Sequence, residues 1–367
     1  MSVILGSLWG DEGKGLTTSF LCSKLENPLV IRFNGGHQAG HTIEQDGIRH
    51  VFSNFGSGTL QNIPTYWSKY CTFYPIGVSN ELKALRRHNY QPKLFVNPLC
   101  PVTTPYDVEI NRSIEITNQH GSCGVGFGST IQRQESYYKL YVQDLFFEDV
   151  LIAKLSNIEK YYNFSISQFS MDNFLEKCRE VRDFIQVKTY DDIVRETKGK
   201  FQPVCEGAQG LLLDMDFGFF PNVTRSNTTC RNAFDIAGTQ DVYYAVRTYQ
   251  TRHGNGFMTN EELPFPTLIN NEKETNQFND WQGEFRKSIL DLDLLNYAYK
   301  CDSNFSTTVA KKLMITCVDQ TGENIVVTKN KKVMEINFAD IPNYLDIKFK
   351  AVYASFGPSI KDIVKIR

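Results

Sequence analysis

Short apolar runs that end in glycine-rich loops mark the N-terminal part of the chain. Residues 2–5 predict a buried strand, and a glycine loop at 10–15 follows it directly. Residues 17–25 have the pattern of a helix, while 29–33 and 93–96 predict two further buried strands. Strands that alternate with helices are typical of a parallel α/β sheet, in which loops at the carboxyl ends of the strands form the functional site.

Helical periodicity replaces this pattern between about residues 144 and 197. The stretches 144–162 and 171–185 place apolar residues three and four positions apart among charged ones, which predicts two helices. Residues 203–206 predict another strand, ended by a Gly-Ala-Gln-Gly turn. Further along the chain we expect a helix and then two late strands, at 290–299, 313–318 and 351–356.

The chain shows no internal repeat, no linker-like composition and no low-complexity tract. We therefore expect an α/β fold in which one large domain over residues 1–367 has a mostly parallel central sheet flanked by helices. The helical subregion at about 144–197 and the loops at about 251–290 are then insertions into this domain.

Composition narrows the class of protein. Lys and Arg total 39 against 41 Asp and Glu, so the chain lacks the basic excess of a nucleic-acid or membrane-surface binder. No apolar run approaches the roughly 18 to 20 residues of a membrane span, and the short N-terminal run lacks the basic flank of a signal peptide. The nine cysteines are odd in number and form no CxxC motif, which argues against a disulfide framework or a zinc site. We expect a cytoplasmic protein with no nucleic-acid and no membrane partner.

The loop at 10–15 has the character of a phosphate cradle without being a Walker A motif, which would need glycine in place of Leu8 and a hydroxyl residue in place of Gly15. Its glycines let backbone N–H groups approach phosphate oxygens at a helix N-terminus, and Lys14 adds a positive charge. The carboxylate of Asp11 would be repelled there unless it binds Mg²⁺ or takes up a proton. The alternative is a plain glycine turn with solvated charges.

A second glycine-rich loop at 35–42 carries two histidines, His37 and His41. A lone histidine is usually structural, but here the backbone on both sides is kept free of side chains. We interpret at least one of the two as catalytic and favour His41.

These loops and several later segments resemble the adenylosuccinate synthetases. The 36–42 segment is similar to the GHNAGHT motif of that family, with Gln38 in place of asparagine, and 206–210 is identical to its EGAQG motif. The matching segments occur in order along the chain, at 9–15, 36–42, 206–214, 221–229, 251–261, 316–319 and 355–358.

The resemblance implies an activity. The family joins L-aspartate to C6 of a purine nucleotide: a nucleoside triphosphate phosphorylates the 6-oxygen, and the aspartate amine then displaces the phosphate. By resemblance Asp11 is the general base, His41 donates to the developing negative charge, Lys14 neutralises the moving phosphoryl group and Gln209 holds the purine edge. Mg²⁺ would bridge Asp11, the Gly40 carbonyl and phosphate oxygens.

The resemblance also assigns binding residues, including contacts in the loops at about 251–290. For the triphosphate these are Gly10, Glu12, Gly13, Gly15, Leu16, Gly40, Thr42, Asp319, Ser355, Gly357 and Pro358. For the purine monophosphate they are Asn34, Gln38, Ser122, Cys123, Gln209, Thr224 and Gly256. Arg133 and His253 are further candidates from the residues themselves, for a phosphate and for the ribose, each with a structural role as the alternative. For L-aspartate they are Arg286, Gln282 and Gly283. Homodimers are usual in this family, so we expect one here.

The chain departs from the family pattern in its length and in three places, one of which is 122–128, in place of the family's TTGRGIGP. It is shorter than the usual enzyme, and residues 279–287 replace the arginine-rich aspartate loop, which leaves Arg286 as the expected clamp for aspartate. Cys317 replaces the lysine of a TKLD motif, so the donor stays open between GTP and ATP or dATP.

These departures resemble the short phage-type branch, the 2-aminoadenylosuccinate synthetases, which use dGMP and would work in a host cytoplasm. Many members of that branch have a small residue where this chain has Asp11, although a carboxylate can accept from N1–H and N2–H of guanine. We favour (d)GMP as the substrate, with IMP as the alternative. Readings outside this activity are another phosphate-cradle ligase or kinase, and a nucleotide-binding protein without catalysis.

Overall fold

The computed structural model describes residues 1–118, 121–238, 240–272, 274, 276, 278 and 280–367. A ten-stranded sheet runs through its centre in the order β16-β15-β12-β9-β1-β8-β2-β5-β6-β7, and all its neighbours pair in parallel except β15 and β16. Its strands are β1 Ser2–Gly6, β2 Pro28–Arg32, β5 Thr65–Trp67, β6 Leu94–Val96, β7 Gln186–Val187, β8 Gln202–Gly210, β9 Asp241–Arg247, β12 Ala310–Thr316, β15 Ala351–Ser355 and β16 Ile363–Lys365.

Two smaller sheets accompany the large one. The four-stranded sheet has the order β10-β11-β13-β14, and β3 and β4 form a separate antiparallel pair. Their strands are β10 Tyr249–His253, β11 Phe285–Asp291, β13 Asn324–Lys329, β14 Lys332–Asn337, β3 His41–Gln45 and β4 Ile48–Phe52.

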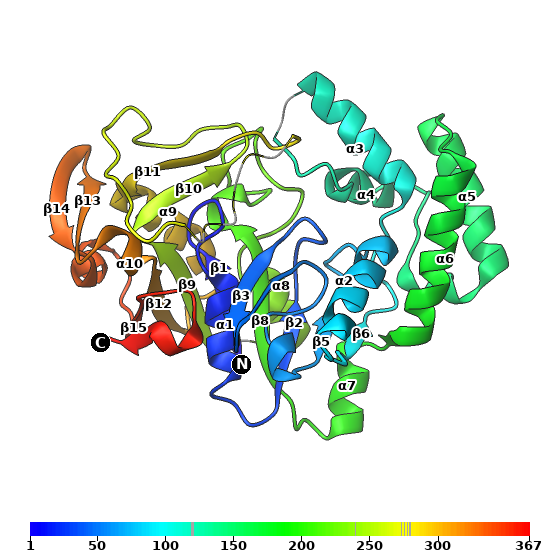
Figure 1. The fold of residues 1–367 in the computed structure, drawn as a ribbon, viewed down its shortest axis with the longest axis horizontal. Coiled ribbons are helices and arrows are strands. Elements are labelled where there is room, and N and C mark those ends of the chain that lie inside the picture. Colours follow the sequence, from blue (N-terminus) through cyan, green and yellow to red (C-terminus); the bar gives the residue numbers. More distant parts are fainter. Residues whose placement is uncertain (119–120, 239, 273, 275, 277, 279) are drawn as a thin grey trace.

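Helices flank the large sheet, and Figure 1 shows α3, α4, α5 and α6 gathered at one end of the molecule, with β13 and β14 at the other. The α-helices are α1 Lys14–Cys22, α2 Pro75–Arg87, α3 Pro105–Asn118, α4 Phe127–Gln134, α5 Glu148–Tyr162, α6 Gln168–Phe184, α7 Tyr190–Thr197, α8 Arg231–Ala237, α9 Leu292–Ser303 and α10 Val318–Thr321. Short 3₁₀ turns are η1 Thr59–Gln61, η2 Val142–Phe146, η3 Leu211–Leu213, η4 Phe338–Tyr344 and η5 Ile360–Asp362. Among the described residues, none of the helices has both the length and the apolar character needed to span a bilayer.

Strand β1 illustrates how the core is built on both faces of the sheet. Val3 and Leu5 pack into one apolar cluster, while Ile4 between them packs into another. Alternate side chains of a strand point to opposite faces, so a strand buried on both sides needs a continuous apolar run. The run at 2–5 meets that need, and it leaves the following glycine loop at the carboxyl edge of the sheet.

The predicted α/β class with a mostly parallel central sheet is confirmed. The strands expected at 2–5, 29–33 and 93–96 and the helix expected at 17–25 appear as β1, β2, β6 and α1, each with bounds shifted by a few residues. Helices α5 and α6 lie where 144–162 and 171–185 predict them.

Other expectations about elements are wrong in detail. The Gly-Ala-Gln-Gly segment does not end the strand, because β8 extends to Gly210. It forms an irregularity within the strand instead, since the register with β1 shifts between Glu206 and Gly210 and Gln209 has φ of 58°. Residues 290 and 291 end β11, and α9 begins only at Leu292. The late strand expected at 313–318 ends at Thr316. Strand β9, which lies next to β1 in the sheet, was not predicted at all.

Candidate active site

A cleft of about 1050 Å³ opens where several parallel strands end. Strands β1, β2, β8, β9, β12 and β15 all present their carboxyl ends at the same edge of the sheet. The loops that follow them, or the last residues of these strands, contribute to the lining, which includes residues 9–16, 37–42, Gln209, Arg247, 316–317, 319–320 and 355–358. Ligand sites of open α/β sheets occur at this edge.

The first glycine loop leads directly into helix α1. Gly10 and Gly13 have φ of 106° and 85°, and Gly13 caps the N-terminus of α1. A side chain at Gly15 would place its Cβ 2.8 Å from Cβ of His41, so glycine is required for the two loops to touch. The positive end of α1 and its free N–H groups therefore face the cleft beside His41, as an anion site requires.

Lys14 shares this loop with a buried carboxyl group. Its Nζ lies 3.9 Å from Oε2 of Glu12, whose other oxygen accepts a hydrogen bond from the Leu8 N–H. Burial raises the pKa of Glu12 to about 7, even though Lys14 and the Leu8 N–H favour the ionised form. Because Glu12 is only partly ionised near neutral pH, much of the positive charge of Lys14 is left for an anionic ligand.

His41 begins strand β3, and Glu206 of β8 holds its side chain in place. Its Nδ1 lies 2.8 Å from Oε1 of Glu206, and this carboxylate also accepts from the Ser57 hydroxyl and N–H. Although burial favours the neutral acid, His41 and Arg32 keep the pKa of Glu206 at about 2, and burial lowers the pKa of His41. Because an ionised carboxylate can only accept, Nδ1 of His41 carries the hydrogen of this contact. This leaves Nε2 as the atom without a hydrogen-bond partner in the described structure.

Two side-chain amides converge on the same region. The buried Oε1 of Gln209 and both polar atoms of Gln38 have no hydrogen-bond partner among the described residues. A Cβ placed on Gly35 would lie 3.4 Å both from Oε1 of Gln209 and from Nε2 of Gln38, so the amides lie close together. Buried polar atoms are nearly always paired in native proteins, which makes these amides candidates for contacts to a ligand.

Comparison with known proteins identifies this arrangement. The profile described as adenylosuccinate synthetase matches residues 3–366. The chain belongs to the adenylosuccinate synthetase family. The adenylosuccinate synthetase of Tolumonas auensis is 32% identical over 73% of this chain, a match that spans 64% of that relative's length. The enzyme of Buchnera aphidicola subsp. Schizaphis graminum is 29% identical, and the match covers 96% of this chain and 83% of the relative.

Two solved structures share the fold of this family member. The fully ligated adenylosuccinate synthetase of Plasmodium falciparum superposes with a TM-score of 0.79 at 20% identity, covering 100% of this chain and 99% of that one. The succinoaminodeoxyadenylate synthetase of cyanophage S-2L, bound to dGMP and to dATP as an energy donor, superposes with a TM-score of 0.68 at 18% identity. That match covers 99% of this chain and 94% of the phage protein.

The residues that the family resemblance assigned to the triphosphate lie together along the cleft. They come from the segments that follow β1, β2 and β12 and from the end of β15 with its loop. These residues are Gly10, Glu12, Gly13, Gly15, Leu16, Gly40, Thr42, Asp319, Ser355, Gly357 and Pro358. Burial raises the pKa of Asp319, and the nearby Asp362 acts in the same direction. Their binding roles stay predictions.

The residues assigned to the other two substrates divide into two groups. Gln38, Cys123, Gln209, His253 and Gln282 line the cleft, as do Asp11, Lys14 and His41. Asn34, Ser122, Arg133, Thr224, Gly256, Gly283 and Arg286 do not belong to its lining. Asn34 instead exchanges two hydrogen bonds with the backbone of Ala208, which fixes the end of β8 next to Gln209.

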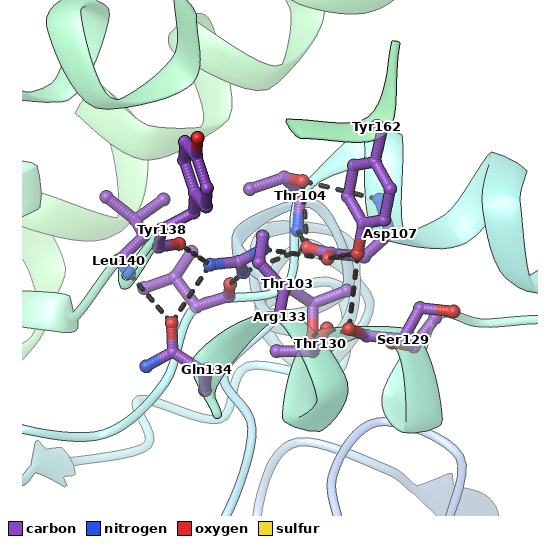
Figure 2. A network of polar contacts seen from close by, with 12 residues as sticks. Thr103, Thr104, Asp107, Ser129, Thr130, Arg133, Gln134, Tyr138, Leu140 and Tyr162 are labelled. Carbon is purple, nitrogen blue, oxygen red and sulfur yellow. Dashed lines mark hydrogen bonds and ion pairs between the residues drawn. The ribbon is translucent and has the colours of Figure 1, made fainter. Parts of the chain in front are cut away.

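Arg133 is a structural residue in this chain and not part of the cleft. Its side chain is fully buried and forms a bidentate ion pair with Asp107, at 2.9 and 3.0 Å. It also donates to the carbonyl oxygens of Val102 and Tyr138, and Tyr162 donates to the same carboxylate at 2.7 Å (Figure 2). All the guanidinium nitrogens are thereby engaged, so Arg133 ties α3, α4 and α5 together and has no donor left for a phosphate.

This network predicts a large loss of stability in Asp107→Asn. Removal of the carboxylate charge leaves the guanidinium of Arg133 buried without its counter-ion, which costs about 3–5 kcal/mol in free energy of unfolding. Urea denaturation followed by circular dichroism measures the change. Glu109→Gln on the same helix is the control, because Glu109 pairs with Arg112 near the surface and such pairs contribute only about 0–1 kcal/mol. Equal effects of the two substitutions would contradict the structural role.

Arg286 is likewise engaged within the protein. It forms a bidentate pair with Glu261, with N···O distances of 2.7 and 2.8 Å, and donates to the carbonyl oxygens of Gly254 and Gly256. These contacts stabilise the turn after β10. The expected clamp for aspartate is therefore not presented to the cleft.

Sequence reasoning missed Arg247 and Glu274, which form an ion pair of 2.7 Å within the cleft lining. Arg247 is the last residue of β9, and recognition of the apolar run in 241–247 as a strand would have placed it at the carboxyl edge. Nothing in the sequence indicates that Glu274 is its partner.

The residues present fit a magnesium ion. Asp11 and Gly40 both line the cleft next to the N-terminus of α1, and Mg²⁺ prefers one or two protein oxygens together with phosphate oxygens and water. No cluster of three or more His, Cys, Asp or Glu side chains with metal-ligand geometry occurs among the described residues, which is compatible with that mode of binding.

Proposed function

We propose that this chain is a purine nucleotide:L-aspartate ligase. The γ-phosphoryl group of a nucleoside triphosphate is transferred to the 6-oxygen of a purine monophosphate while the N1 proton leaves. The amine of L-aspartate then attacks C6, the C–O bond to the phosphate breaks, and orthophosphate is released with the new C–N bond formed.

The convergence of unsatisfied polar groups in the cleft carries this proposal. Nε2 of His41, both polar side-chain atoms of Gln38 and Oε1 of Gln209 are buried and unpaired within the described structure, and Asp11 lines the same cleft. A purine with a 6-oxo group and an N1–H offers the matching acceptors and donors. A cleft specialised for phosphate transfer to a simple hydroxyl would have no need of two amides that read a base edge.

Each residue has a defined task in this reaction. Asp11 accepts the N1 proton, and Lys14 with the N–H groups of α1 stabilises the transferred phosphoryl group. When an anionic ligand binds, His41 donates a hydrogen bond through Nε2. Negative charge near Nε2 favours the protonated ring, and the carboxylate of Glu206 at Nδ1 stabilises the same form. Bound Mg²⁺, held by Asp11 and the Gly40 carbonyl, would neutralise charge on the phosphates.

We further propose guanosine or deoxyguanosine monophosphate as the purine substrate. Guanine differs from hypoxanthine by a 2-amino group that requires an acceptor, and Oε1 of Gln38 is a buried acceptor without a partner among the described residues. The phage structure with dGMP shares this fold, which supports the same assignment. IMP is the second candidate, favoured by the presence of Asp11 and by bacterial relatives named adenylosuccinate synthetase.

Two residues after β12, Cys317 and Asp319, bear on the choice of phosphoryl donor. Asp319 can accept from N1–H and N2–H of a guanine base, which favours GTP, whereas Cys317 in place of lysine leaves room for ATP or dATP. We also propose a homodimer, on the basis of family membership.

Aspartate-dependent release of orthophosphate tests this function. IMP, GMP and dGMP are each combined with GTP, ATP and dATP in the presence of Mg²⁺, with reactions lacking aspartate as controls. We expect turnover with GMP or dGMP. Turnover with IMP alone would identify an adenylosuccinate synthetase and overturn the guanine assignment, phosphate release independent of aspartate would indicate another phosphate-transfer enzyme, and no release with any pair would favour a binding protein without catalysis.

A further inference from the structure

The proposed reaction needs a cation for a substrate with two carboxylates. Among the described residues that line the cleft, the lysine and arginine side chains are Lys14, Arg49 and Arg247. Lys14 belongs to the phosphate loop, and Arg49 lies on β4, in the strand pair outside the large sheet. Arg247 is the one that ends a strand of the central sheet, at the edge where the cleft opens.

Arg247 lies directly against the glycine loop at 10–15. Its Nε donates to the backbone carbonyl of Asp11 at 2.5 Å, and its Nη1 donates to the Tyr249 hydroxyl at 2.7 Å. The same Nη1 donates to Oε2 of Glu274 at 2.7 Å. The guanidinium is thus fixed in orientation beside Asp11, and its partner carboxylate comes from the segment that precedes β11.

That segment is attached to helix α10, which follows β12. The N–H of Ile269 donates to the carbonyl of Gln320 at 2.9 Å, and the Asn270 side chain donates to the carbonyl of Asp319 at 3.3 Å. Glu274 therefore enters the cleft from a chain segment that does not belong to the central sheet.

The charge state of Glu274 makes it a competitor for an incoming carboxylate. Burial opposes its ionisation, but the guanidinium of Arg247 and hydrogen bonds from Asn276 together lower the pKa of Glu274 below its usual value. An ionised carboxylate thus pairs with Arg247 in this structure. A buried guanidinium holds whichever carboxylate is present, because leaving it unpaired is costly.

We propose that Arg247 binds a carboxylate of L-aspartate. Glu274 then pairs with Arg247 only in the absence of this substrate, and the substrate carboxylate displaces it. This inference rests on the ligase function proposed above and assigns the carboxylate-binding residue that the sequence placed at Arg286. The triphosphate offers a second source of anionic oxygens near Arg247, and the kinetic experiment separates the two.

The experiment measures initial rates of phosphate release against aspartate concentration, and separately against triphosphate concentration, for four proteins. These are the wild type, Glu274→Gln, Arg247→Ala and the control Arg195→Ala, whose side chain is exposed on α7. Arg247→Ala should raise KM for aspartate about 10- to 100-fold, the range expected for loss of charge-assisted hydrogen bonds. Glu274→Gln should lower KM for aspartate, by up to about tenfold, because the competing carboxylate is removed.

The opposite signs distinguish a substrate contact from a merely structural ion pair. If the pair only stabilises the fold, both substitutions lower the melting temperature and neither lowers KM for aspartate, which overturns the proposal. A rise of KM for the triphosphate alone in Arg247→Ala would also overturn it and would assign Arg247 to phosphate oxygens. Absence of aspartate-dependent turnover in the wild type would contradict the ligase function itself, so the two failures are distinct.

Discussion

Asp11→Asn is expected to lose at least ~10²-fold in kcat while the protein stays folded. The carboxylate is the proposed acceptor of the N1 proton, and an amide cannot take up that proton at neutral pH. Asp11 has φ of 61°, a backbone conformation that asparagine adopts readily, so the loop is expected to keep its shape. Steady-state kinetics gives kcat, and calorimetric titration with the purine monophosphate shows whether binding persists.

Asp46→Asn provides a matched control for this prediction. Asp46 also has positive φ, at 49°, but it is exposed in the turn between β3 and β4 and is not part of the cleft lining. Its substitution should leave kcat within about twofold, since surface changes of this kind alter free energies by only about ±0.5 kcal/mol. Near-normal turnover in Asp11→Asn would remove the general-base role from this residue.

His41→Ala should also cost at least ~10²-fold in kcat, with the nucleotide still bound. The substitution removes the one group that can supply a proton or hydrogen bond through Nε2 at this place in the cleft. It also leaves Glu206 buried without its main partner, so thermal denaturation must be recorded to separate lost activity from lost fold. His88→Ala, at an exposed position at the end of α2, is the control and should behave as the wild type.

Glu206→Gln tests how His41 is held in position. Glutamine still accepts from Nδ1–H, so the ring keeps its orientation, but the negative charge that favours the protonated ring is lost. Removal of the Glu206 charge lowers the pKa of His41, so we expect a loss of about tenfold in kcat and a displacement of the basic limb of the pH–rate profile to lower pH. An unchanged pH profile would mean that Glu206 supports the loop without influencing the charge of His41.

The glycine loop at 10–15 could be predicted because its determinants are local. Positive φ at Gly10 and Gly13, the helix that begins at Lys14 and the preceding apolar strand are all encoded within about fifteen consecutive residues. The same holds for the loop that carries His41. Sequence order and strand ends then suffice to bring both loops to one edge of the sheet, as a parallel α/β fold requires.

Contacts between distant segments could not be predicted in this way. His41 and Glu206 are 165 positions apart, and only the neighbouring places of β2 and β8 in the sheet bring their ends together. The glycines of segment 207–210 predict a turn, yet β8 continues to Gly210, because Gly6 of β1 supplies a pairing partner beyond the irregular residues 207–209. Tertiary pairing overrides local propensity in strands more than in helices.

The two arginines expected at the site show where the sequence reaches its limit. A guanidinium in a sequence is equally suited to a phosphate, a substrate carboxylate or a buried ion pair, and the choice depends on what surrounds it. The sequence by itself determined the fold class, the phosphate loop and the identity of Asp11 and His41 as chemical candidates, because strands, turns and helix starts depend on neighbouring residues. Only the tertiary structure decided that Arg133 is buried against Asp107, that Arg286 is held by Glu261 and that Arg247 faces the cleft, because long-range packing decides which charged side chains remain available to a ligand.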